Sequence, residues 1–521
     1  MDQAARRKQP NLLRNMLVNV GGRGILTLLA LAVTPVLVRK LGTDVYGIYV
    51  LAFTLGGTLA ILDVGLTPAV VMLLSRAWQA NDRPQMERIL GTALAAYFAV
   101  GVVLAGVVAL LVPWLTVSLL HVPARLQSQA EISLWLSTAS FLLALLFSVF
   151  NSVPTALERF DLVVLRTVGV SLVTTAAVII YVLAGGGLVG VIVINLAGNA
   201  VALGLYVALT RVLLPDVAIR PHIDVGIARA IGRFSAFKFS GAIGAVLTYR
   251  FDQVAIAAFL GVRAAGVYVV PATAAARVLQ LLADLMLPLF PRVSKRADEP
   301  ASIRSLLLRS TRLMTLVAAP AFVLLFVFAD STIRAWIGGN EGRVLALEGA
   351  PTLRWLAAAT LIQAVAVVPS VVSEAVGKPE LNNGFAVVSA LINVPLVLIL
   401  VPRLGIEGAA IAYFVNSATQ TVSFVFYAAK RFGKLSPGQL IGQSLLRPLG
   451  AAIVIGVVGW LARPLVTGAV SLVIAVILLL ALYAGAVRLV SAITKDDFEY
   501  LEPFVQRLPR PFHRAFALYA R

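Results

Sequence analysis

The sequence predicts an all-α membrane protein whose chain crosses the bilayer about 14 times. The composition is one reason, because 60% of the 521 residues are hydrophobic and only 13% are charged. The mean hydropathy is +0.93, and a soluble protein of this size would need more polar surface. The second reason is that apolar runs long enough to span a bilayer recur along the whole chain.

The first span follows directly after a basic start. The segment MDQAARRKQP leads into a full-length apolar run with no small-residue cleavage site, so we expect no cleavable signal peptide. The predicted spans begin near residues 15, 45, 89, 132, 162, 188, 236, 264, 306, 353, 382, 406, 442 and 468.

The basic residues predict the orientation of these spans. With a cytoplasmic N-terminus, 31 of the 43 Lys and Arg residues fall in inner segments and nine in outer segments. Because cytoplasmic loops are enriched in Lys and Arg, both termini are expected inside, and the net charge of +19 marks inner loops rather than a nucleic-acid surface. The densest inner loop is 292–312, and helically spaced apolar residues at 220–238 predict a helix along the headgroups.

The chain also repeats itself. LGTDVYGIYV at 41–50 matches LGVRAAGVYV at 260–269 with five identities in ten, an offset of 219 residues (260 − 41). ALERFDL at 156–162 aligns with AVGKPEL at 375–381 at the same offset, and GGLVGVIV at 186–193 aligns with LGIEGAAI at 404–411 one residue closer. Because the offset contains six spans, an even number, the halves are predicted to be two parallel six-helix repeats.

These observations divide the chain into a duplicated core and an addition of two C-terminal helices. The predicted parts are an N-terminal six-helix bundle (1–213), a cytoplasmic linker with an interfacial helix (214–234), a second six-helix bundle (235–431), two additional helices (432–493) and an amphipathic cytoplasmic tail (494–521).

Several kinds of chemistry are excluded by composition. The chain contains no cysteine, and its three histidines lie outside the apolar runs, so we expect no metal site in the membrane and no cofactor. No Gly-x-x-x-x-Gly-Lys-Ser/Thr motif is present, so the chain is expected to have no ATPase of its own.

Charged residues inside the spans are therefore the candidate site. Arg23 costs about 2.5–3.5 kcal/mol at a helix centre, and such residues persist where they face a partner or water. It is flanked by Gly21, Gly22 and Gly24, which permit close approach, and Asn19 lies one turn earlier on the same face. This face is predicted to line a cavity.

Other spans carry further polar groups. Arg250 and Asp252 are two residues apart and should point in different directions, whereas Arg277 and Asp284 share one helix face. For Arg23 and Arg277 the analysis favours a functional role, and Arg250 fits substrate binding and ion pairing equally. For three acids a structural ion pair or interhelical hydrogen bond is favoured, and two asparagines share a face of the sixth span: Asp63, Asp284 and Glu374, then Asn195 and Asn199.

An arginine-lined cavity attracts anions, because guanidinium groups bind phosphate oxygens in a bidentate manner. A lipid diphosphate with attached sugars would need this chemistry together with amides and hydroxyls. A site for organic cations would instead expose carboxylates and aromatic rings.

The stretch LVRKLGTDVYGIYVLAFTLGGTLAILDVGLTPAVV resembles the opening of polysaccharide transporters of the multidrug/oligosaccharidyl-lipid/polysaccharide exporter superfamily. The matching elements are Gly-x-Tyr after a short acidic turn, then Asp63-x-Gly65-Leu66, and later GIEGAAIAY. The resemblance implies a flippase that moves undecaprenyl-diphosphate-linked oligosaccharide across a bacterial inner membrane for O-antigen, capsule or exopolysaccharide. It implies a multi-pass protein with both ends cytoplasmic, and as partners the lipid-linked glycan, membrane lipid and polysaccharide polymerase or glycosyltransferases of the same pathway, with no nucleic acid.

On this interpretation Arg23 and Arg277 neutralise the diphosphate and Arg250 assists. Asn19, Asn195 and Asn199 bind sugars, and Asp252 is the candidate for ion coupling. Related lipid II flippases carry functional arginines in their first, second and eighth helices. The second helix here has Asp63 as its only buried charge, which argues against lipid II as the substrate.

Two alternatives remain open. A cation-coupled multidrug exporter of the same superfamily should have an acidic cavity. A membrane-embedded glycosyltransferase or polymerase should have catalytic clusters in long outer loops, and residues 331–351 offer only a modest set of charges.

Overall fold

The computed structural model describes residues 12–59, 63–286, 289–294 and 299–493, and these residues form helices without any strand. Within that part of the chain, eleven helical stretches are long and apolar enough to cross a membrane. The protein is therefore a multi-pass, all-α membrane protein, as the composition predicts. The amphipathic tail predicted at 494–521 lies outside the described residues.

The described residues group into two compact units. Unit 1 comprises Met1–Val270, Ile337–Gly342 and Asn383–Ala412, and unit 2 comprises the remaining residues. The helices wholly in unit 1 are α1 (Leu12–Leu41), α2 (Thr43–Leu59), α3 (Asp63–Gln79), α4 (Arg83–Trp114), α5 (Ala124–Ala156), α6 (Phe160–Leu183), α7 (Leu188–Leu213), α8 (Val225–Tyr249) and α9 (Phe251–Leu260).

The remaining helices belong to unit 2 or have residues in both units. Those in unit 2 are α11 (Leu289–Ser294), α12 (Pro300–Val327), α16 (Val422–Gly433), α17 (Pro437–Leu440), α18 (Leu446–Ala462) and α19 (Ala469–Leu489). Those with residues in both are α10 (Val262–Leu285), α13 (Ala329–Ile337), α14 (Gly339–Ala375) and α15 (Pro379–Asn416).

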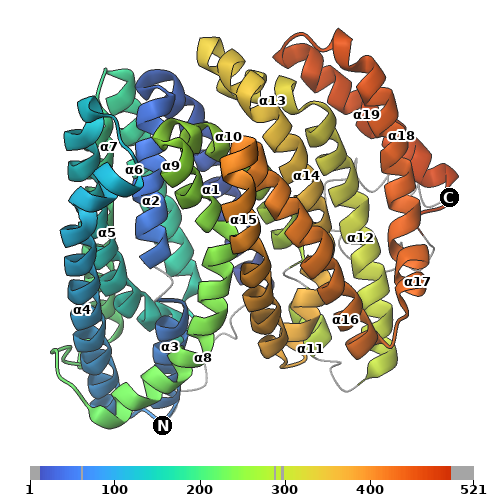
Figure 1. Ribbon diagram of the computed structural model, residues 1–521. Coiled ribbons are helices and arrows are strands. Elements are labelled where there is room, and N and C mark those ends of the chain that lie inside the picture. Colours follow the sequence, from blue (N-terminus) through green and yellow to red (C-terminus); the bar gives the residue numbers. More distant parts are fainter. Residues whose placement is uncertain (1–11, 60–62, 287–288, 295–298, 494–521) are drawn as a thin grey trace. The chain divides into compact units, whose positions relative to one another are not determined.

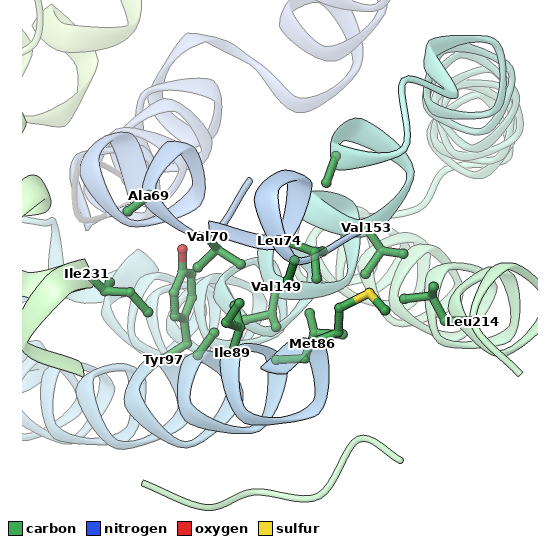
Figure 2. Packing of buried hydrophobic residues seen from close by; sticks show 14 of the residues in the cluster. Ala69, Val70, Leu74, Met86, Ile89, Tyr97, Val149, Val153, Leu214 and Ile231 are labelled. Atoms are coloured by element: carbon green, nitrogen blue, oxygen red, sulfur yellow. The ribbon is translucent and has the colours of Figure 1, made fainter. Parts of the chain in front are cut away.

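The core of unit 1 lies between α3, α4, α5 and α8. Figure 2 shows Leu74 of α3, Ile89 and Tyr97 of α4 and Val149 of α5 packed together, and all four are buried. The Tyr97 hydroxyl lies 3.2 Å from the Thr67 hydroxyl of α3, so the one polar atom of this ring has a partner. In a bilayer such packing, rather than escape from water, holds helices together.

The apolar side chains that face outward fit this environment. Leu110 of α4 is 84% exposed and Leu165 of α6 is 73% exposed, values that would be costly in water and are ordinary against lipid. In unit 2 the equivalent core joins α12, α18 and α19 through Phe328, Ile455 and Tyr483.

The linker after α7 differs from the predicted interfacial helix. Residues 225–249 form one continuous helix, and the chain breaks at Arg250 rather than near residue 236. Just before this helix, His222 and the carbonyl of Arg220 lie against Gly91 of α4, where a Cβ atom would overlap both. The backbone N–H of Asp224 donates to the Thr92 hydroxyl at 3.1 Å, so the linker is fixed across one turn of α4.

Left-handed backbone recurs at positions where the sequence repeats. Gly42 has φ +81° and Gly261 has φ +86°, and these glycines are 219 residues apart (261 − 42). Glu158 at φ +58° and Gly377 at φ +78° are separated by the same distance (377 − 158). Such φ values are uncommon, so equal spacing at two helix junctions is stronger evidence for related halves than the letter matches alone.

Candidate functional site

A break in a membrane helix places Arg250 and Asp252 in different surroundings. The break separates α8 from α9, and Arg250 occupies it with φ −133° and ψ −21°. The Arg250 side chain is exposed, whereas Asp252 in the first turn of α9 is only 6% exposed. A broken helix also leaves backbone groups available, which is a common basis of binding sites in transporters.

Hydrogen bonds satisfy the buried carboxylate of Asp252. One oxygen accepts from the Tyr268 hydroxyl of α10, and the other accepts from the Gln253 backbone N–H at 2.8 Å. The adjacent Gln253 side chain accepts from the Thr54 hydroxyl of α2 at 2.5 Å. The start of α9 also favours negative charge through the helix dipole. Chemically, this buried acid with a hydroxyl donor can exchange a proton or contribute oxygen ligands to a cation.

A second polar contact lies on the other side of the break. The Thr248 hydroxyl is 3.2 Å from the Ser389 hydroxyl of α15, and the Asn393 side-chain N–H donates to the Thr248 carbonyl at 3.3 Å. The helices approach closely because Gly244 faces the Ala386 backbone, where a Cβ would come within 2.8 Å. The Asn393 side-chain oxygen is buried without a hydrogen-bond partner among the described residues.

Sequence reasoning did not identify Thr54, Gln253, Tyr268 or Asn393. Two of them had a usable signal, because Gln253 adjoins a buried acid and Asn393 is an amide within an apolar run. The other two, Thr54 and Tyr268, are ordinary residues in membrane helices, and only tertiary contacts distinguish them.

Helix starts from both halves of the sequence meet at a charged cluster, which we call the Asp44 cluster. Asp44 of α2 lies 2.6 Å from Arg125 of α5 and 3.7 Å from Arg263 of α10. Nearby, the Thr43 hydroxyl donates to Glu341 of α14 at 2.8 Å. Four segments far apart in the sequence are thus joined at one end of unit 1.

A reciprocal glycine contact lies beside this cluster. A Cβ atom on Gly47 would overlap the Val262 carbonyl, and one on Gly266 would come within 2.5 Å of the Thr43 carbonyl. Thr43 and Val262 are 219 residues apart, as are Gly47 and Gly266 (266 − 47). Each half therefore presents a glycine to the equivalent carbonyl of the other, which is the pattern of a two-fold contact.

The other predicted site residues are dispersed. Arg277 is half-buried in α10, and one turn before the buried Asp284 the Gln280 side chain donates to that acid at 3.0 Å. Glu374 is exposed near the end of α14 and accepts from Asn382 at 3.1 Å. Arg277 belongs to unit 2, whereas Arg250 belongs to unit 1.

Four predicted residues remain on the N-terminal half. Asn195 is half-buried in α7 and donates to the Val191 carbonyl of its own helix at 2.8 Å, and Asn199 is half-buried one turn later. The backbones of Asn19 and Arg23 lie in α1, and Asp63 begins α3, but their side chains lie outside the described part of the structure.

The glycines around Arg23 have separate roles. Gly22 packs against α6, because a Cβ there would come within 2.7 Å of Val164. Gly21 and Gly24 have open space at the same position. Only one of the three is therefore required for helix packing.

Comparisons with known proteins agree with this geometry. A protein assigned as an O-antigen transporter in Shigella flexneri is 21% identical over 414 residues, covering 78% of this chain and 95% of the relative. A second relative, assigned as a low-salt glycan biosynthesis flippase in Haloferax volcanii, is 27% identical over 202 residues, covering 38% of this chain and 42% of its own.

Solved structures show the same fold. The lipid II flippase MurJ in an inward closed conformation superposes with a TM-score of 0.73 at 12% identity, covering 91% of this chain and 98% of that one. An inward-facing multidrug resistance MATE transporter of the MOP superfamily gives a TM-score of 0.66 at 14% identity, covering 78% and 95%.

A sequence model of the polysaccharide biosynthesis protein family matches residues 36–340, which is more than half of the chain. The relatives are named as transporters and flippases, so the protein is a membrane flippase and not an enzyme. The chain belongs to the polysaccharide biosynthesis protein family, within the MOP superfamily.

Proposed function

We propose that this protein translocates undecaprenyl-diphosphate-linked oligosaccharide units from the inner to the outer leaflet of a bacterial inner membrane. The product would supply O-antigen, capsule or exopolysaccharide synthesis. The observation that carries the proposal is the match to an O-antigen transporter over 95% of that relative's length. Partners would be the lipid-linked glycan, surrounding lipid, and the polymerase and glycosyltransferases of the pathway.

The helices support an arrangement of about 14 spans. The stretch Pro379–Gly433 has 55 residues, about 80 Å of helix and enough for two crossings, and it contains a break at Gly405 with φ +63°. The pairs α2–α3 and α8–α9 would each provide one further crossing. These additions raise the eleven apolar stretches to the predicted number, with both termini cytoplasmic by the distribution of basic residues.

Two related halves would supply alternating access. The repeated left-handed turns and the reciprocal Gly47–Gly266 contact support halves of common origin that close against each other at the Asp44 cluster. By the predicted orientation this cluster lies at the outer face. Opening it would require breaking exposed ion pairs, each worth no more than about 1 kcal/mol.

The residue roles follow the sequence analysis. Arg23, Arg250 and Arg277 would bind the diphosphate, and the exposed side chain of Arg250 at a helix break suits this role. Asn19, Asn195 and Asn199 would bind sugars. Asp252 would couple transport to a proton or cation, since its buried carboxylate is held by neutral donors. Asp63, Asp284 and Glu374 would be structural.

Complementation of a flippase-deficient strain tests this function. The wild-type protein should restore surface glycan, and Arg250→Ala and Arg277→Ala should each reduce it at least about tenfold, because a charged hydrogen bond contributes about 1.5–3 kcal/mol. Arg159→Ala is the matched control, since Arg159 lies in an exposed turn paired with Asp161 at 3.1 Å. Full glycan export by membrane-inserted Arg250→Ala and Arg277→Ala variants would refute the assignment.

The rival function is cation-coupled drug export, which the MATE-like fold permits. That function predicts raised resistance to cationic drugs on overexpression and no restoration of glycan. The two outcomes can be measured in the same strain.

A further inference from the structure

An arginine outside the proposed transport site is held between three helices of unit 1. The guanidinium carbon of Arg166 in α6 lies 4.2 Å from the ring centre of Phe147 in α5 and 4.1 Å from that of Tyr206 in α7. The two rings meet edge to face with centres 4.8 Å apart. Figure 1 shows α5, α6 and α7 in the same part of unit 1.

This contact satisfies the face of the guanidinium but not its N–H groups. Arginine has five N–H donors. One Arg166 N–H donates to the Thr167 hydroxyl at 3.3 Å, and Nε is buried with no hydrogen-bond partner among the described residues. Stacking on aromatic rings therefore leaves donors directed along the plane of the group, where they can bind an anion.

The neighbouring hydroxyls are also unsatisfied. Tyr206 is fully buried and Thr210 is 1% exposed, and neither hydroxyl has a hydrogen-bond partner in the described part of the chain. These residues are four apart on α7 and therefore share one face. Burying a hydroxyl without a partner costs free energy, so such a pair beside an arginine indicates a polar occupant.

The position along the helices indicates which kind of occupant. Arg166 is six residues from the start of α6, about 9 Å, while Phe147 and Tyr206 lie near the ends of α5 and α7. The three helix ends carry Arg159 and Arg211 as well, and the acid Asp161 is already bound by Arg159. This depth is near the boundary between hydrocarbon and headgroups, where lipid phosphates lie.

We propose that Arg166, Tyr206 and Thr210 form a binding site for a phosphate group at the membrane interface, distinct from Arg23, Arg250 and Arg277. The guanidinium supplies charge and paired N–H donors, and the two hydroxyls donate to further phosphate oxygens. The phosphate could belong to an anionic phospholipid or to a prenyl diphosphate. The site does not depend on the proposed transport function.

Binding measurements on the purified full-length protein in phosphatidylcholine nanodiscs test the site. The probes are short-chain phosphatidylglycerol, farnesyl diphosphate and inorganic pyrophosphate, each titrated by calorimetry. Against the probe that binds, Arg166→Gln should weaken affinity about tenfold or more and Tyr206→Phe several-fold, because each removes donors to a charged group. Arg159→Ala, at the same helix ends, should bind as the wild type does.

The probes separate the sources of the phosphate. Binding of phosphatidylglycerol alone assigns the site to membrane lipid, and binding of farnesyl diphosphate or pyrophosphate assigns it to diphosphates. Binding of no probe, or equal binding by wild type, Arg166→Gln and Tyr206→Phe, would overturn the proposal. A lowered melting temperature with unchanged affinity would also overturn it, since that result describes a purely structural arginine.

Discussion

The start of α2 and the start of α10 place glycines at the same positions, yet the residues beside those glycines differ. Both helices follow a glycine with positive φ and then present a second glycine to the other helix. In α2 the intervening residues are Thr43 and Asp44, whereas in α10 they are Val262 and Arg263. Asp44 and Arg263 are equivalent positions, and they form an ion pair with each other.

This difference shows what duplication preserved and what it changed. Close approach of two backbones admits no side chain, so the glycines remain in both halves. Charges at a two-fold contact cannot be identical without repulsion, because equivalent residues face each other. Opposite charges at 44 and 263 remove that repulsion and make the contact asymmetric.

The largest effect is expected from filling the glycine contact. Gly47→Val and Gly266→Val should each lower stability and glycan export strongly, by about 3 kcal/mol or more, because the atoms in the way are backbone. The measurements are the melting temperature and complementation. Gly106→Val is the control, since a Cβ there meets nothing within 4 Å. Tolerance at one glycine with loss at the other would show that the contact is not reciprocal.

A smaller effect is expected at the paired turns. Gly42→Ala and Gly261→Ala should each cost about 1–2 kcal/mol, since both have positive φ and neither Cβ would meet another atom within 4 Å. The cost is then backbone strain alone and should be similar in the two halves. Chemical unfolding of both variants measures it, and a difference above about 1 kcal/mol would break the equivalence.

The charge asymmetry predicts an ordered series. Asp44→Asn removes two pairs, to Arg125 and Arg263, whereas Arg263→Gln removes only the longer one. We expect a loss of about 1 kcal/mol for the first and a few tenths for the second, both reduced by salt. Melting temperatures at low and high ionic strength provide the test, and a larger loss in Arg263→Gln would contradict the geometry.

The smallest effect is expected from making the halves more alike. Thr43→Val gives α2 the residue that α10 has at this position and removes the hydrogen bond to Glu341. Loss of one such bond should cost about 1 kcal/mol or less while the glycine contact persists. Thr43→Ser retains the hydroxyl and is the control, and an equal loss in both variants would show that the hydrogen bond is not the cause.

Several features of the fold could be predicted from the sequence. Apolar length identified membrane helices, and the repeat at 41–50 and 260–269 located two turns whose glycines have matching backbone angles. The predicted difference in direction between Arg250 and Asp252 also agrees with their exposure, because helical geometry is local. The helix break at Arg250 was not predicted, since neither proline nor glycine marks it.

The candidate site was less accessible to prediction. Arg166 was counted with an inner loop because it lies close to a predicted span end, and its contacts with Phe147 and Tyr206 join residues from three helices. Likewise, the tyrosine that donates to Asp252 is 16 residues away in the sequence. Neither relation has a period or a motif.

By itself, the sequence determined the membrane environment, the helical class and the relatedness of the halves, because hydropathy, helix length and repetition are properties of the chain in order. Only the tertiary structure decided which buried charges have partners, where a helix is interrupted and which glycines touch. Those outcomes depend on distances between segments that are remote in the chain, and in a low-dielectric interior such distances set the energy of every polar group.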